Sequence, residues 1–149
     1  MWVNWRDDSE ATIRDWLDRP VDGICFDIEH SGFWRSDWGP RPLKLQDALQ
    51  LARTKIAEAP KLIPINPGRY IPDEPHATGN PIFSVMQTDI IHYGYDLTSF
   101  FMNQWSDKSF SMDRLVRLLP DWTAKSPRPI RFWDDFVYWP PIMKWHDKP

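Results

Sequence analysis

The densest group of chemically capable side chains lies between Lys61 and Gly94. Asp73, Glu74 and His76 occur there almost consecutively. A carboxylate–histidine set can hold a divalent metal ion or serve general acid–base chemistry. Ligands this close together on a proline-bounded loop are a weak metal signal, however. The chain also has no HExxH motif, no Cys/His cluster and no histidine pair at i, i+4. We therefore predict no metal site here.

A second acidic pair, Asp27 and Glu29, ends a segment of alternating polarity, Gly23–Glu29. The alternation predicts a strand with one apolar face, which places both carboxylates on the opposite face. Paired carboxylates can perform acid–base catalysis when one of them is desolvated, although the polar face of an edge strand is more often simply hydrated. Cys25 shares this polar face, and no neighbouring basic group activates its thiol. No catalytic residue is predicted from these groups.

Nucleotide and serine-hydrolase signatures are absent from the sequence. The chain has no GxGxxG, P-loop or GxSxG motif. We predict no cofactor and no enzymatic activity. One enzymatic alternative stays open, which is a small metal-dependent hydrolase that uses Glu29, Asp73 and His76.

The segment from Lys61 to Gly94 is better suited to binding. Its prolines each fix a backbone angle and remove an amide donor, so the loop loses little entropy when a partner binds. These are Pro64, Pro67, Pro72, Pro75 and Pro81. The side chains able to contact a partner, or to order the loop through hydrogen bonds, are Arg69, Tyr70, Asp73, Glu74, His76 and Asn80.

Composition bounds the possible partners. The net charge is −3 and the pI is about 5.7, which argues against binding to nucleic acid and weakly favours a basic partner. The chain has one cysteine, so no internal disulfide can form, which suits a reducing compartment. We see neither a signal peptide nor an apolar stretch of about 18 residues, so we expect a cytoplasmic protein without a membrane partner.

The chain of 149 residues is predicted to form a single domain, 1–149. A mixed order of helices and strands indicates the α+β class, with a mostly antiparallel sheet packed with helices. Helices are expected within 1–22, where Asp8 or Ser9 caps the helix and Pro20 ends it, and over Leu43–Ala59, Leu97–Trp105 and Met112–Leu119. Strands are expected over Gly23–Glu29, Leu62–Ile65, Ile82–Gln87 and Ile90–Tyr93. Pro129–Trp139 is expected to be a short helix or an aromatic hook.

Ten tryptophans are an unusual number for a chain of this length. Trp34 and Trp38 fall in an aperiodic aromatic segment, His30–Pro42. Indole rings at a surface are typical anchors of protein interfaces. Two alternatives stay open for this pair: an exposed partner site, or a cluster capped internally by the C-terminal aromatic segment.

Together these segments resemble the SUKH superfamily, which includes a fungal cell-wall-assembly regulator and many bacterial proteins. The central match is GRYIPDEPH, then GNPIFSV, QTDII and YG, from Gly68 to Gly94. The flanking matches are GICFDIEHSGFWRSDWGPRP and IRFWDDFV, so the resemblance covers roughly residues 20–137. The Trp-rich N-terminal segment and the tail WPPIMKWHDKP depart from the family pattern.

The resemblance implies an α+β domain without enzymatic activity. It further implies a bacterial immunity protein that binds a toxin, in many cases a nuclease, and blocks its active site. Under this hypothesis Asp27, Glu29, Asp73 and Glu74 face basic groups of the toxin, and Trp34, Trp38 and Tyr70 are the anchors. Arg69 and His76 complete the expected surface. A scaffold domain without a toxin partner is the non-enzymatic alternative, and the residues leave the oligomeric state open.

Overall fold

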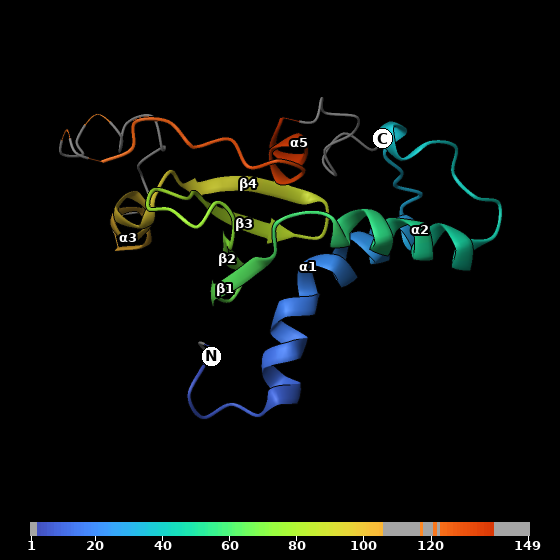
Figure 1. Cartoon of the computed structure of the whole chain (residues 1–149), viewed down its shortest axis with the longest axis horizontal. Helices are drawn as coiled ribbons and strands as arrows, with labels where there is room; N and C mark the ends of the chain where they lie inside the picture. The colour runs from blue at the N-terminus through green and yellow to red at the C-terminus, as the bar shows by residue number, and fades with distance from the viewer. Residues whose placement is uncertain (1–2, 106–116, 118–120, 122, 139–149) are drawn as a thin grey trace, which may run out of the picture.

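The computed structural model describes residues 3–105, 117, 121 and 123–138. Within them the chain forms an α+β fold in which helices pack on a sheet of four antiparallel strands (Figure 1). The strands follow one another in the order β1-β2-β3-β4, so the sheet is a meander without crossovers. The predicted fold class, with its mostly antiparallel sheet, is confirmed.

The elements have the following bounds. The helices are α1 (Glu10–His30), the 3₁₀ turn η1 (Ser36–Trp38), α2 (Leu45–Ala57), α3 (Leu97–Trp105) and α5 (Trp133–Val137). The strands are β1 (Leu62–Asn66), β2 (Arg69–Pro72), β3 (Ile82–Met86) and β4 (Asp89–Gly94). The predictions for α2, β1, β3, β4 and α3 are confirmed within the usual uncertainty at element ends. The helix predicted over Met112–Leu119 lies outside the described residues.

One long helix replaces the predicted helix and strand at the start of the chain. α1 runs for 21 residues through Pro20, so the strand predicted over Gly23–Glu29 is wrong, as is the helix end at Pro20. Ser9 caps the helix by accepting a hydrogen bond from the Thr12 amide, as expected from its position. Pro20, Ile24 and Ile28 are buried at intervals of four residues, which is a helical stripe. Burial of this stripe offsets the hydrogen bond that the proline removes.

A strand absent from the sequence-based prediction lies in the middle of the sheet. β2 follows β1 after a tight turn in which Gly68 has a φ of +74°, a conformation suited to glycine. Tyr70 pairs with Pro64 on one side and with Phe83 on the other. The segment is part of the sheet because Tyr70 buries its ring there, in spite of the surrounding prolines.

The hydrophobic core fills the space between one face of the sheet and the helices. Each strand contributes to it, through Leu62, Tyr70, Phe83 and Ile90. The helices contribute Ile24, Ile28, Ala48, Ala52, Ile56, Trp133 and Phe136. α3 lies at the β4 edge (Figure 1), and none of its nine residues carries a charge. No helix in the described part of the chain has the length and apolar character needed to span a membrane.

Candidate partner-binding surface

The acidic residues of the proline-rich loop are engaged within the domain. The Asp73 carboxylate accepts a hydrogen bond of 2.7 Å from the backbone N–H of Lys61. Glu74 forms an ion pair of 3.1 Å with Arg131. His76 is exposed beside them. Since Asp73 and Glu74 both serve internal contacts, they offer a partner less unsatisfied charge than their types indicate.

Asn80 is the residue that orders this loop. Its amide group donates to the carbonyl oxygens of Pro72, at 3.1 Å, and Pro75, at 2.9 Å. Arg128 in turn donates to the Asn80 side-chain oxygen at 2.8 Å. Asn80 is buried, so the structure places it in the loop-ordering role that the sequence left as one of two possibilities.

The residues of the hydrolase alternative do not come together. Among the residues that the structure describes, no three His, Cys, Asp or Glu side chains are grouped so that they could hold a metal ion. Glu29 lies near the end of α1, whereas Asp73 is hydrogen-bonded to the residue before β1. The set of Glu29, Asp73 and His76 is therefore not assembled as a metal site.

The aromatic anchors expected at the surface are mostly core residues. Tyr70 is 2% exposed, and burial raises the pKa of its hydroxyl. Trp38 is 7% exposed; its ring packs edge-on against Trp34 and stacks on Phe132. Trp34 is half-buried, and its indole N–H donates to the carbonyl of Gly39 at 2.8 Å. The C-terminal aromatic segment thus caps this pair, which is the second of the two alternatives.

Arg35, which the sequence-based prediction does not include, fixes this aromatic cluster. Its buried guanidinium forms ion pairs with Asp37, at 2.6 Å, and Asp135, at 2.9 Å. The same group lies about 5 Å from the ring centres of Phe132 and Phe136. Its hydrogen bond holds the pKa of Asp37 below the usual value. Arg35 thus joins the His30–Pro42 segment to α5.

Asp27 anchors the turn between β3 and β4 to α1. Its side chain is 1% exposed, because this part of the chain is helical and the residue faces inward. The carboxylate accepts hydrogen bonds from the Thr88 backbone N–H, at 3.0 Å, and from the Thr88 hydroxyl, at 2.6 Å. Gly23 lies directly against Gln87, where a Cβ would be 3.0 Å from the Gln87 Cα. The turn is therefore docked closely on the helix.

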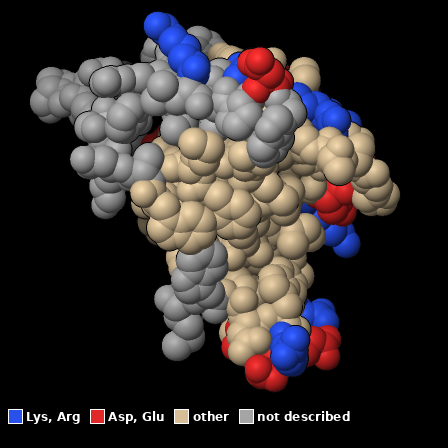
Figure 2. All heavy atoms as spheres, turned by 90° about the vertical axis from the view of Figure 1, so that its left-hand side faces the viewer, with Lys and Arg blue, Asp and Glu red and all other residues tan. Residues whose placement is uncertain are grey.

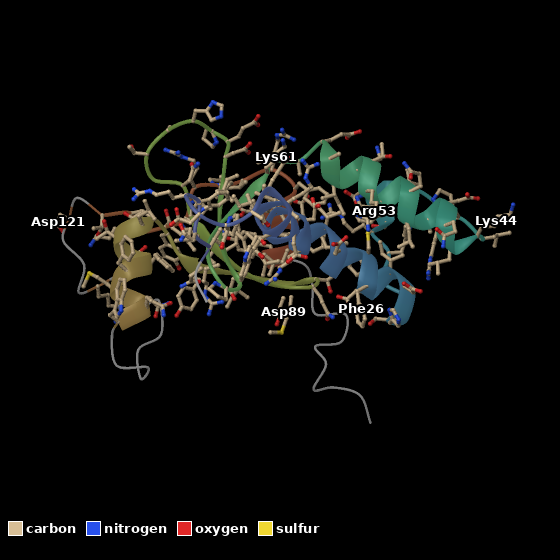
Figure 3. The ribbon with its side chains drawn as sticks, turned by 90° about the horizontal axis from the view of Figure 1, so that it is seen from below. Phe26, Lys44, Arg53, Lys61, Asp89 and Asp121 are labelled. Carbon is tan, nitrogen blue, oxygen red and sulfur yellow. The ribbon has the colours of Figure 1, made fainter. Side chains whose placement is uncertain are left out.

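Exposed apolar side chains lie on the helix and the hairpin that this contact joins. Phe26 is 45% exposed, Met86 73% and Ile91 51%. Glu29 and Asp89 are exposed acids that belong to the same helix and hairpin. Figure 3 labels Phe26 and Asp89 along one edge of the molecule, with Lys61 toward the opposite edge. We call the five residues Phe26, Glu29, Met86, Asp89 and Ile91 the hairpin patch.

Arg69 borders the hairpin patch on the open face of the sheet. It pairs with Ser84, which pairs with Ile91, so these residues form one row across three strands. The guanidinium donates to the Ser84 hydroxyl at 2.8 Å and lies 3.9 Å from the centre of the Tyr93 ring. Of the residues expected at a partner surface, Glu29 is exposed on α1, and Arg69 lies in the same row of the sheet as Ile91. Asp27 is buried.

Charged side chains are unevenly spread over the surface. Figure 2 shows them gathered around the start of α1, at the lower end, and along the upper and right-hand margins. The described surface between these groups is uncharged, and α3 faces the viewer there. α3 leads directly into residues that are not described, so the hairpin patch is the better-defined candidate surface.

Comparisons with protein-family models, with curated proteins and with solved structures find no match for this chain. The α+β architecture thus rests on the structure itself. The likeness to the SUKH superfamily stays a prediction from the residues that carry it.

Proposed function

We propose that this chain is a non-enzymatic protein-binding domain, and that it acts in the bacterial cytoplasm as an immunity protein. It binds a toxin domain and blocks its active site. The hairpin patch is the observation that carries this proposal, because it combines exposed apolar side chains with exposed acids on a rigid support.

The composition of the hairpin patch suits a protein interface. Aromatic residues and methionine are enriched where proteins meet, and a few such residues usually carry most of the binding energy. Phe26 and Met86 have this character, and each exposes a large part of its side chain. They come from elements that Asp27 joins through hydrogen bonds, so little ordering is needed when a partner binds.

The acids of the patch favour a basic partner. Glu29 and Asp89 are exposed acids on the same helix and hairpin as the apolar residues, and the whole chain carries a net charge of −3. A nuclease active site is lined with basic groups that bind phosphate, so opposite charges would speed the encounter. The sequence resemblance between Gly68 and Gly94 supports the same class of function.

Neutralisation of a purified toxin domain tests the proposal. The neighbouring genes are first inspected for a large multidomain toxin; where one is encoded there, its C-terminal domain is the probe and is assayed for nuclease activity, and the absence of such a gene supports the scaffold alternative. We expect the chain to form a stable complex with that domain and to abolish its activity at equimolar concentration. A complex that leaves the activity unchanged would favour the scaffold alternative, and the absence of any complex would contradict an immunity role.

A further inference from the structure

A cavity of about 510 Å³ opens between the first half of α1 and the end of α2, away from the hairpin patch. Ile13, Leu17 and Val21 form one wall and follow each other at intervals of four residues along α1. Ile56, Leu62 and Trp133 complete the cavity from α2, β1 and α5. Its volume lies within the range of about 300–1,000 Å³ that small-molecule sites occupy.

The walls offer apolar contact and little else. Trp133 is 2% exposed, and its indole N–H already donates to the Pro60 carbonyl oxygen at 2.7 Å. The ring therefore adds apolar surface without an unsatisfied donor. A ligand body that fills this space must itself be hydrocarbon or aromatic, because buried polar groups without partners are costly.

Two of the three cations that line the cavity form ion pairs. Arg14 pairs with Glu10, and Arg53 pairs with Asp22 at 2.9 Å. Asp18 also lines the cavity, and its negative charge contributes to the raised pKa of Arg53.

Lys61 is the remaining rim cation. Within the described ranges its ammonium group has no hydrogen bond or ion pair, and the contact with Asp73 is made by the Lys61 backbone N–H. Figure 3 labels Lys61 and Arg53, which border the cavity from the start of β1 and from α2.

We propose that this cavity binds a small amphipathic carboxylate, with its apolar chain or ring against Trp133 and its carboxylate at Lys61. An apolar body matches the walls, and a single negative charge matches the one unpaired ammonium group. The site is separate from the hairpin patch, so the proposal does not depend on the immunity role.

An NMR titration of the full chain tests this site. The probes are octanoate, decanoate and the decyltrimethylammonium cation, and the reporter is the assigned Trp133 indole N–H. We expect decanoate to shift this resonance with saturation and to bind about tenfold more tightly than octanoate, since each added methylene contributes to apolar burial. The cation of the same chain length should bind at least tenfold more weakly than decanoate.

Variants separate the charge from the cavity. Lys61→Gln should weaken decanoate binding by roughly five- to tenfold, because it removes one charge-assisted contact, and should not weaken binding of the cationic probe. Lys44→Gln, an exposed lysine outside the cavity, is the matched control and should change neither affinity. Leu17→Asp should abolish binding of decanoate. If this variant does not fold, the comparison of Lys61→Gln with Lys44→Gln still shows whether Lys61 binds the carboxylate.

Two results would overturn the proposal. One is an unperturbed Trp133 resonance with decanoate at millimolar concentration. The other is equal affinity for decanoate and for the cationic probe, which would show that Lys61 selects no charge.

Discussion

At the scale of single residues, Asp27 connects the helix to the hairpin. Its buried carboxylate is the acceptor for both the backbone N–H and the hydroxyl of Thr88. We predict that Asp27→Ala lowers the free energy of unfolding by about 1–3 kcal/mol, because these donors lose their partner. Urea denaturation measures this difference. Glu29→Ala, an exposed acid on the same helix, should stay within about 0.5 kcal/mol of the parent, and equal losses in the two variants would contradict the assigned role.

His92 gives the fold a dependence on pH. Its side chain is buried against Phe83, and burial lowers the pKa of the imidazole below 6.5, although the hydrogen bond to Asp134 acts in the opposite direction. The unfolded chain therefore binds a proton at a higher pH than the folded chain does. The stability contributed by neutral His92 is complete above pH 6.5 and is lost as the pH falls from there toward the lowered pKa.

We predict that the free energy of unfolding decreases as the pH is lowered from about 8 to about 5, the range in which histidine titrates. Chemical denaturation at several pH values measures this free energy. Replacement of His92 by Gln should flatten the dependence over this range. The pKa of Asp37 is lowered from its usual value of 3.8, so this carboxylate does not change its charge in this pH range. If the free energy of unfolding depends on pH equally steeply in the His92→Gln variant, groups other than His92 cause the effect.

At the scale of elements, periodicity predicted most of the helices and strands but misread α1. Ile24, Phe26 and Ile28 alternate like a strand, and Pro20 is an ordinary stop signal for a helix. The competing helical stripe, Pro20, Ile24 and Ile28, is also present in the sequence. The segment folds as a helix because α2 and the sheet bury this stripe. A local sequence pattern does not reveal such a tertiary contact.

The candidate surface was only partly predictable for a similar reason. Glu29 was expected at the surface on account of its charge, and it is exposed. Phe26 and Met86 lie on two elements that are joined because Asp27 binds Thr88, a residue 61 positions away in the chain. Likewise, Trp38 is buried by Phe132, which no periodicity in the His30–Pro42 segment could indicate.

The junction between β4 and α3 leaves no room for a side chain at Gly94. A Cβ at this position would lie 2.7 Å from the Cα and the backbone nitrogen of Phe100. We predict that Gly94→Ala destabilises the domain by about 1–3 kcal/mol, since strand and helix must move apart. The melting temperature in thermal unfolding measures this loss, with Met102→Ala on the exposed side of α3 as the control. Equal melting temperatures of Gly94→Ala and the parent chain would show that the junction yields easily.

At the scale of the whole molecule, the acids of the hairpin patch should act on the rate of encounter. We predict that Glu29→Lys with Asp89→Lys slows association with the toxin domain by about tenfold at low salt and affects dissociation less. Stopped-flow measurements at low and high ionic strength separate these effects. The double variant Glu10→Lys with Asp15→Lys, at the far end of α1, is the matched control in charge. An equal loss in both variants would indicate that net charge matters and the patch does not.

The central claim is that the apolar residues of the hairpin patch hold the partner. Its most direct measurement is the dissociation constant of the toxin-domain complex for the double variant Phe26→Ala, Met86→Ala. Leu43→Ala is the matched control, since Leu43 is a fully exposed apolar residue outside the patch. The account predicts an affinity loss of at least a hundredfold for the double variant and none for the control. Parent-like affinity in a folded double variant would contradict it.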